Sequence, residues 1–179
     1  SMGHIGMRGS LVSREVIADS IETVVFAERF DGLVAVAGCD KSLPGAMMAI
    51  ARLNVPSVFI YGGSILPGNL NGKTIQIQDV FEAVGKHQSG EINDSELYQI
   101  ESRACPGPGS CGGMFTANTM SSVGEALGLS LPGSASEPAV DQRKSASSRL
   151  AGEAVLNLLR NDIKPCLLYT SPSPRDRIS

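Results

Sequence analysis

The sequence predicts an α/β fold in which a parallel sheet is flanked by helices. Two short apolar runs, residues 33–37 and 57–61, indicate buried strands because each is bounded by Gly or Pro. A segment with helical character, residues 46–53, lies between them and follows a Pro-Gly pair. Two strands joined through a helix by short connections form a right-handed parallel βαβ unit. With 179 residues, 42% hydrophobic and 18% charged, the chain is long and apolar enough for one domain with a substantial core.

Further helices are predicted on both sides of this unit. Ser13 is a suitable N-cap for a helix over residues 14–30. Its apolar face is predicted from the spacing i, i+4, i+7, i+8 of Ile17, Ile21, Val24 and Val25. Later helices are predicted over residues 79–89, 93–102, 114–127 and 141–160, and the Gly-rich residues 1–9 indicate a loop.

Composition excludes several classes of function. Aromatic residues make up 4% of the chain with no Trp, and the formal net charge is -3, so no nucleic-acid partner is predicted. No apolar run approaches the ~18 residues of a membrane span, so no membrane association is predicted. Residues 68–74 resemble a phosphate-binding P-loop but are one residue short, and a strand-like alternation follows them, so we reject that interpretation.

Candidate functional residues gather in the loop after the first strand, where Cys39, Asp40 and Lys41 are consecutive. Ligands of open α/β sheets bind at the carboxyl ends of strands, which favours a functional site here. A buried structural cysteine beside a surface Asp–Lys pair is the alternative, and the residues alone leave both open.

A second cysteine loop, residues 105–113, holds the densest Gly/Pro cluster of the chain and leads into a predicted helix. Thiols near a helix N-terminus have a lowered pKa, which favours the thiolate at Cys111. The four cysteines include no Cys-x-x-Cys pair, and the two histidines are far apart, so a zinc finger fits poorly.

From Cys166 the chain is polar, rich in Pro and without periodicity. The first eleven letters of this stretch, CLLYTSPSPRD, look like the in-frame translation of a sequencing-library adapter. We therefore predict one domain over residues 1–165 and a non-native tail over residues 166–179. A natural disordered tail is the alternative.

Taken in order, the motifs resemble those of the dihydroxy-acid dehydratases, in the group that also contains sugar-acid and phosphogluconate dehydratases. The matching segments are residues 3–7 (GHIGM), 13–18 (SREVIA), 38–41 (GCDK) with Pro44 and Gly45, 111–120 (CGGMFTANTM) and 125–133 (EALGLSLPG). The likeness extends from Ser1 to about Pro165. It implies that this chain is part of the N-terminal domain of a two-domain enzyme.

The resemblance implies that Cys39 and Cys111 are thiolate ligands of an iron–sulfur cluster, since thiolates hold such clusters. It also implies that Asp40 ligates a catalytic Mg²⁺, and that Lys41 does so after carbamylation, which gives it an anionic oxygen. Some relatives have a cysteine where this chain has Pro108, so [2Fe–2S] is favoured over [4Fe–4S]. Cys105 is expected to be structural, and His4 to line the site without a catalytic role.

The implied reaction removes water from a 2,3-dihydroxy carboxylic acid to give a 2-oxo acid on the route to valine, isoleucine and leucine. In the family a cluster iron acts on the C3 hydroxyl as a Lewis acid, and Mg²⁺ holds the carboxylate and the C2 oxygen. A further cluster cysteine, a further Mg²⁺-binding aspartate and the proposed serine base have no counterpart in this sequence. We therefore expect the polypeptide to be inactive alone. The resemblance also implies a homodimer, in the cytoplasm if the source is bacterial and in a plastid or mitochondrion if it is eukaryotic.

Two other functions stay open. A sugar-acid or phosphogluconate dehydratase would use the same ligands on a different acid. A non-catalytic α/β module could instead hold an anion at helix N-termini through its Gly loops. Colour separates the classes, because a cluster protein is brown and contains acid-labile sulfide, whereas an anion-binding module or a zinc protein is colourless.

Overall fold

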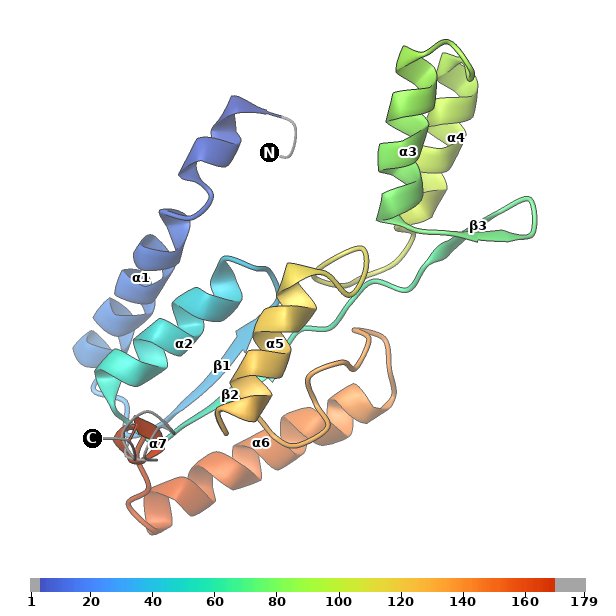
Figure 1. The fold of residues 1–179 in the computed structure, drawn as a ribbon. Helices are drawn as coiled ribbons and strands as arrows, with labels where there is room; N and C mark the ends of the chain where they lie inside the picture. Colours follow the sequence, from blue (N-terminus) through green and yellow to red (C-terminus); the bar gives the residue numbers. More distant parts are fainter. Residues whose placement is uncertain (1–3, 170–179) are drawn as a thin grey trace, which may run out of the picture.

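The computed structural model describes residues 4–169. A two-stranded parallel sheet, β1 (Leu33–Ala37) and β2 (Ser57–Tyr61), lies at its centre (Figure 1). Its register pairs the first residues of the two strands with each other and likewise the last, Ala37 with Tyr61. Both strands lie at the predicted residues and run parallel, so the predicted α/β fold and its βαβ unit are confirmed.

Helices cover both faces of this sheet. On one side lie α1 (Ser13–Glu28), α2 (Ser42–Leu53) and α5 (Thr116–Ala126), and on the other side lies α6 (Arg143–Arg160) (Figure 1). The side chains of β2 alternate between the two layers, as a strand requires. Phe59 and Tyr61 belong to the core that includes α2 and α5, whereas Val58 and Ile60 pack with Ala151 of α6. The second strand is therefore buried on both faces.

Small residues bring α1 close to α2. Ala18 is fully buried between the two helices, and a Cβ at Gly45 would lie 2.8 Å from the Cγ2 of Ile17. Val24, predicted to lie on the inner face of this helix, is 53% exposed. Val25 packs inward instead, and successive residues point about 100° apart around a helix, so Val24 turns away.

The segment after β2 forms a separate arm. β3 (Gly68–Leu70) and β4 (Lys73–Ile75) make an antiparallel hairpin where the P-loop-like residues lie. The helices α3 (Ile77–Gln88) and α4 (Asp94–Ala104) pack on each other and extend away from the sheet (Figure 1). Both helices begin with a capping box, in which the N-cap side chain and the third helical residue satisfy each other's backbone N–H.

Other differences from the sequence-based expectation lie at the ends of elements. Residues predicted as an N-terminal loop contain a 3₁₀ helix, η1 (Ile5–Gly9), and His4 accepts a hydrogen bond from the Gly6 N–H at 3.0 Å. α2 begins at Ser42 rather than at the predicted residue 46. This start is possible because Pro44 falls in the first turn of the helix, where a missing backbone N–H breaks no helical hydrogen bond.

At the other end of the chain, α7 (Cys166–Tyr169) is a single short turn, and the Cys166 N–H donates to the Asn54 side chain at 2.9 Å. The rest of the predicted tail lies outside the described residues, so the boundary at residue 166 stays a prediction. Within residues 4–169, no helix combines the length and the apolar character needed to cross a bilayer.

Candidate functional site

A cavity of about 500 Å³ lies where the chain leaves β1 and β2. Its lining brings together the segment after β1, the 105–117 region and the first turns of α3. All four residues predicted to bind a cluster or a metal line this cavity, namely Cys39, Asp40, Lys41 and Cys111. The two cysteine loops, far apart in sequence, therefore face the same space.

The first cysteine loop is held by the serine that follows it. The Ser42 hydroxyl accepts hydrogen bonds from the backbone N–H groups of Gly38, at 3.3 Å, and Cys39, at 3.1 Å. The Cys39 carbonyl in turn accepts from the Leu43 N–H at 2.9 Å. Serine hydroxyls often bind backbone groups a few residues away in this manner. Here the Ser42 hydroxyl holds the backbone of Cys39 close to the N-terminus of α2.

Asp40 and Lys41 form a half-buried ion pair, with Lys41 Nζ 2.7 Å from Asp40 Oδ1. The Cys39 Sγ lies 3.4 Å from the same oxygen. Burial raises the pKa of Asp40, but the hydrogen bonds from Lys41 and Cys39, together with the Lys41 charge, outweigh burial and lower this pKa overall. Asp40 is therefore a carboxylate at neutral pH.

Two backbone hydrogen bonds attach the second cysteine loop to the chain that leaves β2. The Ile65 N–H donates to the Cys111 carbonyl at 2.7 Å, and the Ser110 N–H donates to the Gly63 carbonyl at 2.8 Å. A Cβ at Gly62 would lie 2.6 Å from the Ser110 Oγ, and a Cβ at Gly38 would overlap the Ser110 side chain outright. The two cysteine loops can approach each other because both glycines lack a side chain.

The comparisons with known proteins identify the family of the chain. Residues 1–178 match the family model described as "Dihydroxy-acid/6-phosphogluconate dehydratase N-terminal". The chain belongs to the dihydroxy-acid/6-phosphogluconate dehydratase family. The resemblance inferred from the motifs is thus confirmed.

Several relatives in this family are more than half identical to the chain. A protein of Staphylococcus saprophyticus named dihydroxy-acid dehydratase 2 is 61% identical over 179 residues, which are 100% of this chain and 32% of the relative. A dihydroxy-acid dehydratase of Oceanobacillus iheyensis is 58% identical over the same share of each chain. One from Prochlorococcus marinus is 54% identical, again over 100% of this chain and 32% of the relative. The chain thus spans about a third of the length of these curated relatives.

Cys105 also lines this cavity, where it is closely packed. A Cβ at Gly112 would lie 2.8 Å from the Cys105 Sγ and 3.0 Å from the Cβ of Ile77. Burial, and to a lesser extent the charge of Cys111, raises the pKa of the Cys105 thiol. Cys105 is thus a closely packed thiol with a raised pKa, and its structural role stays a prediction.

The donor chemistry around the cavity fits each implied group in part. Cys39, Cys105 and Cys111 are free thiols, and sulfur is the ligand of iron–sulfur clusters. Asp40 supplies the carboxylate oxygen that Mg²⁺ prefers. Within the described part of the chain, no three His, Cys, Asp or Glu side chains form a metal-binding group by themselves. The cavity therefore offers cysteine sulfurs for a cluster and one carboxylate, next to a lysine, for a hard cation.

Sequence reasoning assigned no role to two of the groups that shape this site. The Arg14 side chain, from α1, donates to the Asp40 carbonyl from Nη2 at 2.9 Å and from Nε at 3.2 Å. No local pattern connects residues so far apart in sequence. The apolar wall of the cavity was missed as well, and it consists of Met7, Ile65, Ile77, Phe81, Phe115 and Ala117. Ile77 and Phe81 are four residues apart on α3, a spacing that places both side chains on the same face of the helix.

Proposed function

We propose that this chain forms the cluster-binding and Mg²⁺-binding part of a dehydratase that converts a 2,3-dihydroxy carboxylic acid into a 2-oxo acid in branched-chain amino acid biosynthesis. The observation that carries the proposal is that Cys39, Asp40, Lys41 and Cys111 line one cavity. The names of relatives that are 54–61% identical over the whole chain support the same reaction.

Cys39 and Cys111 are the proposed thiolate ligands of an iron–sulfur cluster. Pro108 favours [2Fe–2S] over [4Fe–4S], because it occupies a position where some relatives have a further cysteine. α2 begins three residues after Cys39, and its N-terminus favours negative charge nearby.

Asp40 and Lys41 are the proposed ligands of Mg²⁺. The lysine ammonium has no lone pair for a metal and instead pairs with Asp40 at 2.7 Å. Carbamylation would replace this cation with an anion beside the Asp40 carboxylate. Two neighbouring anions repel each other unless a cation binds between them, so carbamylation and Mg²⁺ binding stabilise each other.

A cluster held by Cys39 and Cys111 and a Mg²⁺ held by Asp40 and Lys41 would supply Lewis acidity, which would weaken the bond to the departing hydroxyl and acidify the neighbouring C–H. The chain's own side chains hold and select the substrate. Ile65, Ile77, Phe81 and Phe115 give the cavity an apolar wall. A branched alkyl group packs well against such a wall, whereas the hydroxyls of a sugar acid would lose their hydrogen bonds there. This contrast favours the branched-chain substrate over a sugar acid.

For the complete enzyme we further propose a homodimer without a nucleic-acid partner. Its location is the cytoplasm if the source is bacterial, and a plastid or mitochondrion if it is eukaryotic.

The experiment is anaerobic reconstitution of the purified chain with ferrous iron, sulfide and a small thiol that completes the ligand set. We expect a brown protein with stoichiometric acid-labile sulfide. Cys39→Ser and Cys111→Ser each remove most of the iron and sulfide, whereas the matched variant Cys105→Ser retains them. A wild-type chain that stays colourless, or equal losses in all three variants, contradicts the proposal.

The Mg²⁺ site has its own measurement. Incubation with ¹³C-labelled bicarbonate and Mg²⁺ should give a carbamate carbon signal in the NMR spectrum. Lys41→Arg should abolish that signal, while Lys73→Arg, an exposed lysine on β4, should leave it unchanged. A carbamate signal that survives in Lys41→Arg would place the modification elsewhere.

A further inference from the structure

A short connecting segment, residues 61–65, links the end of β2 to both cysteine loops. It starts with the last residue of β2. The Gly62 N–H donates to the carbonyl of Ala37, two residues before Cys39, at 2.8 Å. The Gly63 carbonyl and the Ile65 N–H make the two hydrogen bonds that hold the second cysteine loop. The positions of both loops therefore depend on the position of this segment.

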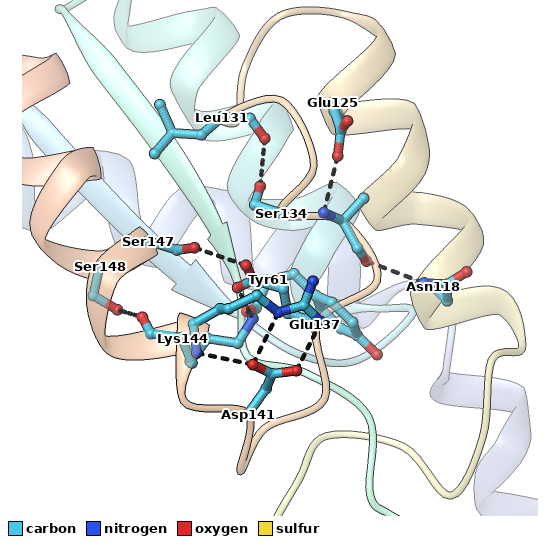
Figure 2. Close-up of polar contacts among 12 residues, drawn as sticks. Tyr61, Asn118, Glu125, Leu131, Ser134, Glu137, Asp141, Lys144, Ser147 and Ser148 are labelled. Carbon is cyan, nitrogen blue, oxygen red and sulfur yellow. Dashed lines mark hydrogen bonds and ion pairs between the residues drawn. The ribbon is translucent and has the colours of Figure 1, made fainter.

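The connecting segment is bound from the start of α6. Lys144 Nζ donates to the Tyr61 carbonyl at 2.9 Å and lies 5.7 Å from the centre of the Tyr61 ring (Figure 2). One ammonium group thus contacts the backbone of Tyr61 through a charge-assisted hydrogen bond and its ring through a cation–π interaction. Five residues earlier, the Ala139 N–H donates to the Ser64 carbonyl at 3.0 Å. The chain around the start of α6 therefore holds the connecting segment near both of its ends.

Lys144 is itself oriented by a buried acid. Glu137 is 5% exposed, and its Oε2 lies 3.4 Å from Lys144 Nζ in an ion pair. The other carboxylate oxygen of Glu137 accepts from the hydroxyl of Ser147, three residues after Lys144 on α6, at 2.9 Å. Acidic and basic side chains are seldom buried, and an apolar pair of similar volume often gives equal or greater stability. The geometry that this ion pair imposes therefore explains its burial better than the stability that it adds.

We propose that Lys144, oriented by Glu137, is a positioning residue that holds the connecting segment and, through it, keeps the two cysteine loops at one cavity. The hold on the segment needs no bound group, whereas its consequence for a cluster rests on the proposed function. Without the ammonium group, the Tyr61 carbonyl loses its partner and the end of β2 is no longer attached to α6 at this point. The hydrogen bonds from the connecting segment to Ala37 and to the second cysteine loop should then open more often.

The test is residue-resolved amide hydrogen exchange, measured by NMR on the cluster-free chain. It compares Glu137→Gln with Glu137→Gln/Lys144→Met, so that neither variant has an unpaired carboxylate at position 137. The two variants differ only at residue 144, where methionine keeps an unbranched chain but lacks the ammonium group. In the double variant we expect the amides of Gly62, Ile65 and Ser110 to exchange about tenfold faster, because a hydrogen bond to a charged group contributes on that scale.

Two controls separate this local effect from a general loss of stability. The Phe59 N–H lies within β2 and donates to the Leu129 carbonyl at 2.7 Å, so its exchange reports on the sheet itself and should change much less. Lys164→Met removes a lysine that pairs with Asp162 beyond the end of α6, and it should leave all these rates as in wild type. Unchanged exchange in the double variant, or an equal change at Phe59, overturns the inference.

The wild type provides a second measurement that does not depend on how the variants fold. If the connecting segment and the chain before α6 are held as one unit, their amides open together. The exchange rates of Gly62, Ile65, Ser110 and Ala139 should therefore rise in parallel as urea is added below the unfolding transition. Separate openings with different urea dependence would overturn the inference even if no variant folds.

Reconstitution connects the role of Lys144 with the proposed function. Iron and sulfide contents should be lower in Glu137→Gln/Lys144→Met than in Glu137→Gln, because the cysteine loops are no longer held in one arrangement. Equal contents in the two variants would overturn the positioning role. A wild-type chain that takes up no iron and sulfide refutes the proposed function instead, and the exchange rates then still decide whether Lys144 holds the connecting segment.

Discussion

Gly38→Ala tests whether the two cysteine loops meet as the structure has them. The backbone at Gly38 does not have a positive φ, so alanine is conformationally allowed there. Its methyl group would overlap the Oγ and Cβ of Ser110, whereas the Ser110 Cα would be 3.5 Å away. The cost of the substitution must therefore come from the Ser110 side chain.

The size of this cost follows from the type of contact. Overpacking a well-packed site costs about 1–3 kcal/mol. For a chain of this length, the melting temperature falls by roughly 2–4 °C per kcal/mol. Ser110→Gly removes both overlapping atoms and leaves only the ordinary 3.5 Å contact. In the double variant Gly38→Ala/Ser110→Gly, we therefore expect most of the stability lost through Gly38→Ala to return.

The assay is a double-mutant cycle of Gly38→Ala and Ser110→Gly, in which the free energy of unfolding of the cluster-free chain is measured in urea. Iron and sulfide contents after reconstitution form a parallel readout, because a displaced Ser110 carries Cys111 with it. Gly38→Ala should lower these contents, and the double variant should restore them. If Gly38→Ala costs the same free energy of unfolding whether residue 110 is serine or glycine, the two loops do not meet at this point and the reasoning is refuted.

Three further predictions concern the fold around the site. Glu125→Ala should destabilise the chain by about 1–3 kcal/mol in urea unfolding, because its carboxylate accepts two backbone N–H bonds from the loop after α5, from Gly133 at 2.7 Å and from Ala135 at 2.9 Å. Figure 2 shows the second of these bonds. An unchanged midpoint would contradict this prediction. Arg52→Ala should lower the melting temperature at low salt, since this guanidinium pairs with three acidic side chains of α1, and the difference should shrink at high salt. The hydrogen bond from Arg143 lowers the pKa of Asp141 from 3.8 to about 2. The resulting stabilisation is present above pH 3.8 and is lost as the pH falls toward 2, so in pH-dependent melts Asp141→Asn should differ most from wild type above pH 3.8.

The parts of the fold that could be predicted from sequence are those set by local patterns. The strands β1 and β2 are short apolar runs with clear boundaries, and the structure has them at the predicted residues. A helix was predicted from residue 93, and the Asn93 side chain caps it by accepting from the Glu96 N–H at 3.0 Å. The residues that form such signals lie within a few positions of each other in the sequence. Their interactions therefore do not depend on how distant segments pack.

Features that depend on packing between distant segments could not be predicted in this way. Arg14 binds the Asp40 carbonyl only because α1 packs on α2. Val24 was assigned to the buried face of α1, but the position of α2 selects Ala18 and Val25 instead. Apolar periodicity in the sequence predicts that a helix has a buried face. Which residues form the centre of that face depends on how the partner helix packs against it.

The contact between the two cysteine loops depends on backbone hydrogen bonds and on glycines, which the short motifs alone do not explain. Backbone groups hold the second loop in place, through Ile65 to Cys111 and Ser110 to Gly63. Side chains at positions 65 and 110 can therefore vary without loss of these hydrogen bonds, whereas the glycines cannot easily change. Gly63 has a φ of 94°, and a Cβ there would collide with the backbone at 138–139. The short motifs mark the chemistry of the site, but the missing side chains of its glycines allow the cysteine loops to share one cavity.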